Sequence, residues 1–79
     1  MKAYVIIKFE PETELHWIVG IFTDLQVAKN MMLKIYSELY EDGWTVKMYS
    51  DTELSCKNRH AVWHFDLMEA PFNQIKNYK

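Results

Sequence analysis

The sequence predicts a small α+β domain: a two-layer sandwich in which one helix covers one face of a four-stranded antiparallel sheet. Four segments are rich in β-branched and aromatic residues or alternate between apolar and polar side chains, as strands do. One segment between them has helical periodicity and carries both a start and a stop signal. The predicted order is therefore β-β-α-β-β, and a single helix can cover only one face of such a sheet.

The size and composition fit one domain that spans residues 1–79. The chain is 49% hydrophobic and 15% aromatic, and it has only two glycines and two prolines, which is typical of a globular protein rather than a disordered one. Its three tryptophans, five tyrosines and four phenylalanines provide large buried areas per residue, which a chain this short needs to build a core.

The first two strands are expected at residues 3–9 and 15–22. The letters AYVIIKF and LHWIVGIF favour strands, and Pro11 with the charges of EPETE marks the turn of a hairpin between them. Gly20 lies inside the second of these segments. A glycine there indicates a bulge or the close approach of another part of the chain.

A helix is predicted to start directly after this hairpin. The letters TDLQ form a capping box, in which Thr23 accepts the amide of Gln26 and the Gln26 side chain reaches back. Asp24 adds a negative charge where the helix dipole favours one. Phe22 and Val27 are spaced for a hydrophobic staple across the cap.

One apolar stripe and a glycine define the rest of the helix. The stripe recurs at steps of three and four residues, as an amphipathic helix requires, and consists of Leu25, Ala28, Met32, Ile35 and Leu39. Gly43 is the expected left-handed C-terminal cap.

Two more strands are expected at residues 44–50 and 61–67, where WTVKMYS and AVWHFDL alternate. Residues 51–60 between them are predicted to be a loop. Pro71 ends regular structure, so residues 69–79 are expected to form a loosely packed tail. Placing the third strand beside the first makes every neighbouring pair antiparallel, in the order 2-1-3-4.

The alternation assigns one set of side chains to the helix and leaves an outer face. On the first two strands the inner set is taken to be Val5, Ile7, Phe9, Leu15, Trp17, Val19 and Ile21, because the opposite parity contains Lys8 and His16. The outer face then mixes aromatic and β-branched residues with charged ones, which is typical of a partner-binding surface. The predicted partner-binding residues are Tyr4, Ile6, Ile18, Lys47, Tyr49, Val62, His64 and Asp66.

Three polar residues of this face support an alternative, a small ligand- or metal-binding module or an enzyme that uses His16, His64 and Asp66. His64 and Asp66 share a face, but residues two apart on a strand stand ~6.5 Å apart along it. The spacing His60-x-x-x-His64 binds zinc on a helix, whereas on a strand these residues are ~13 Å apart. We therefore expect no catalytic site, no metal and no cofactor.

Charge and cysteine content bear on the kind of partner and on the cell compartment. A net charge of −2 and a pI of about 5.8 make nucleic-acid binding improbable, because phosphate binding leaves a basic footprint. Cys56 is the single cysteine, so no internal disulfide forms, which fits a reducing cytoplasm. Its position in the expected loop makes it a surface thiol. No segment has the length and hydropathy of a signal peptide or membrane span.

The first half of the chain resembles a loose class of short bacterial and bacteriophage ββαββ proteins. The matching residues are Gly20, Ile21, Phe22 and Thr23, which end the second strand, and Ala28 in the capped helix. The Met- and Tyr-rich turns of the helix depart from the pattern of that class. Many of its members have no assigned function, and some small phage proteins of this size block host enzymes or defence complexes.

These observations predict a non-enzymatic protein-binding domain that acts through the sheet face not covered by the helix. The resemblance implies a phage-type inhibitor or regulator of a host enzyme or defence complex, which would work in the host cytoplasm. The expected partner is another protein or a second copy of the chain in a homodimer.

Overall fold

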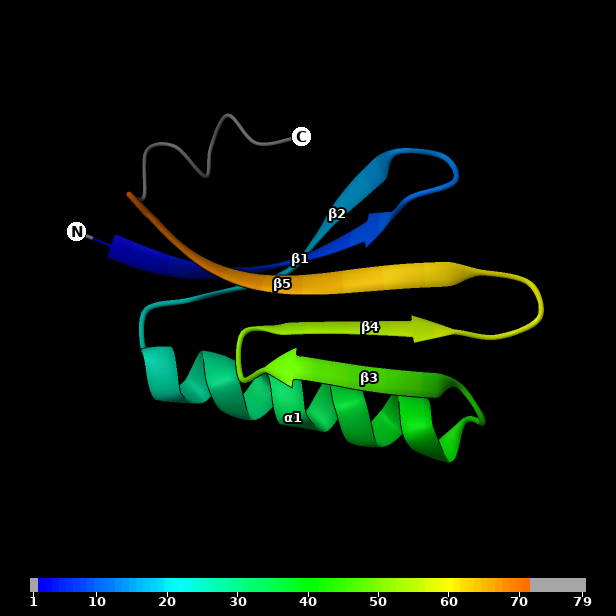
Figure 1. Ribbon diagram of the computed structural model, residues 1–79. Helices are drawn as coiled ribbons and strands as arrows, with labels where there is room; N and C mark the ends of the chain where they lie inside the picture. Colours follow the sequence, from blue (N-terminus) through cyan, green and yellow to red (C-terminus); the bar gives the residue numbers. More distant parts are fainter. Residues whose placement is uncertain (1, 72–79) are drawn as a thin grey trace.

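The computed structural model describes residues 2–71, which form five strands and one helix. The elements are β1 (Lys2–Glu10), β2 (Leu15–Phe22), α1 (Leu25–Glu41), β3 (Thr45–Ser50), β4 (Glu53–Lys57) and β5 (Val62–Pro71). The strands make one antiparallel sheet in the order β2-β1-β5-β4-β3. Figure 1 shows the strands side by side in this order, with α1 along one side of the sheet.

The predicted α+β class and the single helix are confirmed, but the sheet has five strands rather than four. The additional strand is β4, which lies in the segment predicted to be a loop. Its letters ELSCK alternate between polar and apolar side chains, and Leu54 and Cys56 are both buried. Only Asp51 and Thr52 separate β3 from β4, so the two strands form a tight hairpin. The strand order 2-1-3-4 is corrected accordingly, because the last strand, β5, pairs with β1.

The helix ends as the sequence predicts but begins one residue later. Gly43 has φ 88°, its amide donates to the Tyr40 carbonyl, and the Trp44 amide donates to the Leu39 carbonyl. These two bonds are the Schellman pattern of a C-terminal glycine cap.

The N-terminal cap is Asp24 rather than Thr23, so the predicted capping box is wrong. The Asp24 carboxylate accepts the amides of Gln26 and Val27, at 2.8 and 3.2 Å. A carboxylate there also interacts favourably with the helix dipole. The Gln26 side chain turns forward to Asn30 instead of back to the cap. Val27, predicted to staple the cap, is 51% exposed.

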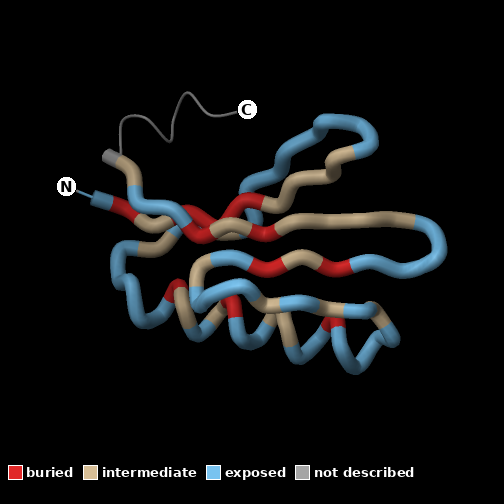
Figure 2. Tube along the Cα trace, in the orientation of Figure 1, coloured by how far each residue is buried: buried red, intermediate tan, exposed pale blue. Residues whose placement is uncertain are grey.

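The hydrophobic core lies between α1 and the central strands. Its buried members come from the helix and from β1, β4 and β5, and Figure 2 shows these buried segments on the central strands and the inner turns of α1. They are Ile6, Ala28, Met32, Leu39, Leu54, Cys56, Phe65 and Leu67. Ile35 packs against this cluster, whereas Leu25 is 39% exposed, so the predicted helical stripe holds except at its first residue.

The predicted parity of β1 is wrong. Ile6 is fully buried in the core under α1 and Tyr4 packs against the same cluster, so neither lies on the outer face. Val5 and Ile7 point to the opposite side, where they form a second buried cluster with Ala3. Register carries Phe9 to this side as well, beside His64 on β5.

Lys8 faces the helix side of the sheet because tryptophan rings cover its charge. Its Nζ lies 3.5 Å from the ring centroid of Trp63 and 5.0 Å from that of Trp17. The indole Nε1 of Trp63 donates to Glu10 at 3.2 Å, and the Trp63 and Trp44 rings are 4.3 Å apart. An ammonium over an indole face is attracted by the ring quadrupole. Two of the three tryptophans therefore cover Lys8, and the third, Trp44, packs against Trp63.

The β1–β2 hairpin contains a β-bulge and one strained residue. The register shifts between the pairs Ile6–Gly20 and Ile7–Ile18, which leaves Val19 as the extra residue. The predicted special role of Gly20 is explained, since a Cβ there would lie 2.8 Å from the Phe22 ring. Glu14, at the end of the turn, has φ 59°.

The last strand is longer than predicted. Residues 69–71, assigned to a tail by the sequence, belong to β5 and pair with the start of β1. The rest of the predicted tail, residues 72–79, lies outside the described residues. Within residues 2–71, no helix is long and apolar enough to cross a membrane.

The parity of β1 yields a stability prediction. Replacing Ile6, which is fully buried, with alanine leaves a cavity between sheet and helix and should lower the free energy of unfolding by about 2–5 kcal/mol. Leu33→Ala is the matched control, since Leu33 is 53% exposed on α1 and its truncation should change stability by no more than about 0.5 kcal/mol. Urea unfolding followed by circular dichroism measures both, and equal losses would contradict the burial of Ile6.

Candidate functional site

The face of the sheet opposite α1, called the open face below, carries most of the predicted partner-binding residues. Cross-strand partners share a face, so the registers place six of the eight there, namely Ile18, Lys47, Tyr49, Val62, His64 and Asp66. Tyr4 and Ile6 are excluded by their place in the core. The same registers add residues that the sequence analysis assigned elsewhere, Ile7, Phe9, Ile21, Ser55 and Lys57, and one that it left unassigned, Met68.

One end of the open face is apolar. Val5 and Ile7 on β1 are only 3% and 5% exposed, although α1 lies on the opposite side of the sheet. Register places Ile21 and Met68 on the two sides of Val5, and Ile18 beside Ile7. These three flanking side chains are 37–47% exposed. The apolar patch made of Ile18, Ile21 and Met68 thus surrounds a small buried cluster.

Two of the three patch residues, Ile18 and Ile21, belong to β2, an edge strand with no buried residue. Its exposed side chains include Leu15, Trp17 and Val19 as well as Ile18 and Ile21. Natural sheets protect an edge with charges, proline, bulges or a covering element. The other edge, β3, carries Lys47 and has α1 packed beside it. The β2 segment LHWIVGIF contains no proline and no Asp, Glu, Lys or Arg, and among the described residues its protective feature is the bulge at Val19.

Phe9 separates the two histidines that were candidates for chemistry. Its ring centroid is 4.6 Å from that of His16 on β2 and 6.3 Å from that of His64 on β5. Register places β1, and with it Phe9, between the two imidazoles. Strands two positions apart in a sheet are ~9.6 Å apart, so a shared ion would require Phe9 to move. Within residues 2–71, no three His, Cys, Asp or Glu side chains are close enough to hold a metal.

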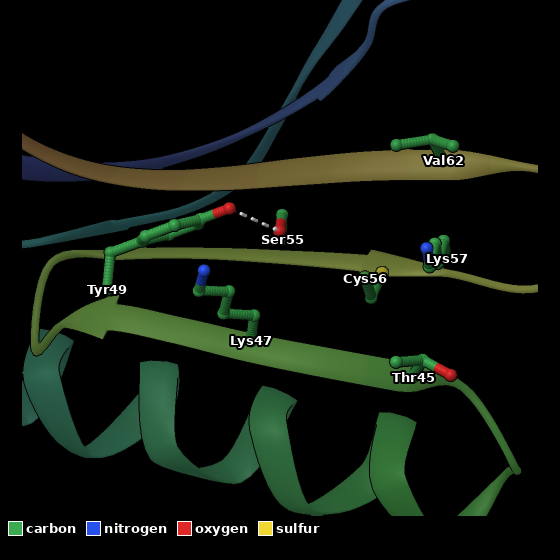
Figure 3. A pocket seen from close by; sticks show the side chains of 7 residues that line it. All are labelled: Thr45, Lys47, Tyr49, Ser55, Cys56, Lys57 and Val62. Carbon is green, nitrogen blue, oxygen red and sulfur yellow. Dashed lines mark hydrogen bonds between the residues drawn. The ribbon is translucent and has the colours of Figure 1, made fainter.

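The other end of the open face holds a shallow pocket. It has a volume of about 350 Å³ and lies over β3, β4 and the start of β5 (Figure 3). Its lining residues are Thr45, Lys47, Tyr49, Ser55, Cys56, Lys57 and Val62. The Tyr49 hydroxyl is 3.3 Å from the Ser55 hydroxyl, and the Lys47 Nζ is 5.1 Å from the Tyr49 ring centroid.

The sequence analysis missed Ser55 and Lys57 because it placed them in a loop. The signal that could have found them is the period-two pattern of residues 53–57, in which Leu54 and Cys56 are apolar and the three residues around them are polar. As a strand beside β3, this segment places Ser55 and Lys57 on the same face as Lys47. The predicted outer face included Lys47 but not these two residues.

Cys56 is a core residue rather than a surface thiol. It is 2% exposed, and it lies on β4 among the side chains under α1, opposite Val46 and Trp63. Burial raises the pKa of its thiol from 9.0 to about 11, although a hydrogen bond from the Trp63 backbone and the charge of Lys8 both act to lower it. The thiolate is the nucleophile in cysteine chemistry, so this environment suppresses reactivity.

The chain matches no protein-family profile, no curated protein and no solved structure. The fold and the geometry of the open face are therefore the observations from which function is argued.

Alkylation of Cys56 should be slow in the folded protein. With a thiol pKa of about 11 instead of 9.0, the thiolate fraction near pH 8 falls roughly 100-fold. Burial adds a steric barrier. Labelling by iodoacetamide, followed by intact mass, should therefore be at least about 100-fold slower in the native protein than in urea. Equal rates would contradict the placement of Cys56 in the core.

The same pKa difference makes stability depend on alkaline pH. The unfolded chain loses the thiol proton near pH 9.0 and the folded chain near 11. Burial of the neutral thiol therefore stabilises the fold fully below pH 9, and this contribution is lost as the pH rises toward 11. The difference in unfolding free energy between wild type and Cys56→Ala should shrink over that interval. The comparison removes the titration of lysines and tyrosines, which both proteins share.

Proposed function

We propose that this chain is a protein-binding domain that works through the open face and the adjoining edge of β2. The observation that carries the proposal is the eight-residue edge strand β2, which within residues 2–71 leaves large apolar side chains exposed on both faces. Unpaired edge groups offer hydrogen bonds to an incoming strand, and the apolar side chains offer contact area.

The exposed apolar area is of the size that an interface uses. Five large side chains of β2 are 37–52% exposed: Leu15, Trp17, Ile18, Val19 and Ile21. With roughly 150–250 Å² for the aromatic Trp17 and somewhat less for each aliphatic side chain, they leave on the order of 400 Å² uncovered. Met68 continues this area across β1. A stable interface buries about 800 Å² per partner, so the strand alone supplies about half.

Catalysis or metal binding by His16, His64 and Asp66 remains a prediction from the sequence, and no geometric feature favours it over partner binding. The ring of Phe9 lies between the imidazoles, where it makes an apolar contact with both. This stack is well suited to a partner surface, because an aromatic ring beside two imidazoles offers a large contact area.

Inhibition of a host enzyme or defence complex likewise remains a prediction, based on the resemblance to short phage proteins. The open face and the edge of β2 support protein binding in general and do not specify the kind of partner. The proposal covers both a second copy of the chain and an unrelated partner, since both would be held by the same apolar edge.

An aspartate at position 18 tests the proposal. Ile18 is 37% exposed on β2, so Ile18→Asp should leave the fold intact and place a charge in the interface. Binding to the partner should weaken at least about tenfold, because a buried unpaired charge is costly. The control is Leu33→Asp, the same kind of change at an exposed position on α1.

Two measurements are needed with these variants, after circular dichroism has confirmed their folds. Sedimentation velocity over a wide concentration range detects self-association, and a tagged pull-down from cells of the source or host detects another protein. Association that Ile18→Asp abolishes and Leu33→Asp retains supports the proposal. A wild-type protein that stays monomeric and retains nothing sensitive to Ile18→Asp overturns it.

A further inference from the structure

The pocket on the open face concentrates positive charge and hydroxyl donors from two neighbouring strands. Lys47 comes from β3 and Lys57 from β4, and Ser55 lies opposite Lys47 in the register. The hydroxyls of Thr45, Tyr49 and Ser55 line the same pocket (Figure 3). Such groups donate hydrogen bonds to an anion, and a charged donor makes the stronger ones.

Within residues 2–71, neither Lys47 nor Lys57 has a carboxylate partner. Lys2, Lys29 and Lys34 form ion pairs with Glu69, Asp51 and Glu38. Among the described residues, no carboxylate lies within 4.0 Å of the ammonium group of Lys47 or Lys57.

The acidic side chains of the open face lie at the other end of this hairpin. Glu53, the first residue of β4, pairs with Asp66; along β4 it is four residues from Lys57 and two from Ser55, the partner of Lys47. Four residues of a strand span ~13 Å, so Glu53 is remote from Lys57. Lys47 is nearer to Glu53, but the two do not form an ion pair. The Lys57 end of the pocket is therefore a local positive site on a chain whose net charge is −2.

The geometry allows both lysines to reach one anion. Register places Lys47 beside Ser55, and Lys57 is two residues further along β4. One strand spacing of ~4.8 Å and two residues of ~3.3 Å each separate their backbones by roughly 8 Å. Both side chains are exposed and have four-carbon stems, so their ammonium groups can converge over the pocket.

We infer that this pocket binds an acidic side chain of a protein partner, with the carboxylate between Lys47 and Lys57 and its stem against Tyr49 and Val62. The inference rests on the proposed function and names the chemistry that the partner presents. Tyr49, which is 53% exposed, and Val62 supply apolar wall beside the charges. A volume of about 350 Å³ is near the lower end for ligand sites and is suited to a single side chain.

A protein carboxylate fits these observations better than a nucleic acid. Binding along a phosphate backbone requires many basic contacts. The β1–β2 turn of this chain instead carries acidic residues, at Glu10, Glu12 and Glu14. One pair of lysines matches one carboxylate, and a partner that carries it would meet the open face at its polar end.

The test compares two blocked dipeptides, acetyl-Phe-Glu-amide and acetyl-Phe-Gln-amide, by NMR titration of the isotope-labelled protein. The glutamate peptide should shift the amide signals of Lys47, Tyr49, Ser55 and Lys57, and the glutamine peptide should bind about tenfold more weakly. Replacing both pocket lysines, Lys47→Gln with Lys57→Gln, should remove the difference, because two exposed charge contacts contribute about this factor. The matched control removes the same charge elsewhere, with Lys2→Gln and Lys34→Gln.

Each outcome decides the inference. Localised shifts that require the glutamate and the two pocket lysines support it. Equal binding of the two peptides, or equal weakening by the control pair, overturns it. Inorganic phosphate and a short single-stranded DNA are titrated in parallel. If either binds the pocket more tightly than the glutamate peptide, the carboxylate assignment fails.

The two proposals fail separately. The dipeptide titration depends on the pocket, whereas the Ile18→Asp comparison depends on β2 at the opposite edge of the sheet. If the dipeptides do not discriminate while association remains sensitive to Ile18→Asp, the carboxylate pocket is wrong and protein binding stands. The converse result keeps the pocket as an anion site and overturns its place in a protein interface.

Discussion

The parity of β1 is the constraint on which the rest of the structure depends. β1 pairs with both β2 and β5, so shifting its faces by one residue would exchange the core and the open face of three strands. Ile6 is buried under the helix, and Val5 and Ile7 are buried on the other side. The strand is thus apolar on both faces at its centre. With Ile6 under the helix, Lys8 lies on the same side of β1. A charged side chain is tolerated there because Trp63 and Trp17 cover its ammonium group.

This double burial explains how far the fold could be predicted from the sequence. Capping residues and the helical stripe located α1, because those signals are local. Alternation fixed the faces of β3 and β5, where the inner side chains are apolar and the outer ones are mostly polar. On β1 and β2 alternation carries little information, and Lys8 was a misleading marker, since its partners Trp17 and Trp63 come from distant parts of the chain. β4 was missed because polar residues outnumber apolar ones around it.

The same distinction applies to the candidate site. Lys47, Tyr49, Val62, His64 and Asp66 were placed on the open face by local alternation, and the registers place them there. Ile18 also lies on this face, but the bulge at Val19 puts Ile21 there as well, which alternation along β2 does not predict. Ser55 and Lys57 depended on recognising β4. The contact of Phe9 with His16 and His64 depended on the order of three strands, which the letters do not specify. Long-range pairing therefore creates the polar pocket and the histidine–phenylalanine stack.

The open face has two chemically different ends that one partner can contact together. The apolar end lies on β2 and the basic pocket lies over β3 and β4, which are at opposite ends of the strand order. Four strand spacings of ~4.8 Å separate the two edges by roughly 19 Å. An interface of about 800 Å² is roughly 28 Å across. In the proposed function, a partner of this width that covers β2 would also reach the pocket, where an acidic residue would fix its orientation while the apolar edge supplies about half of the contact area.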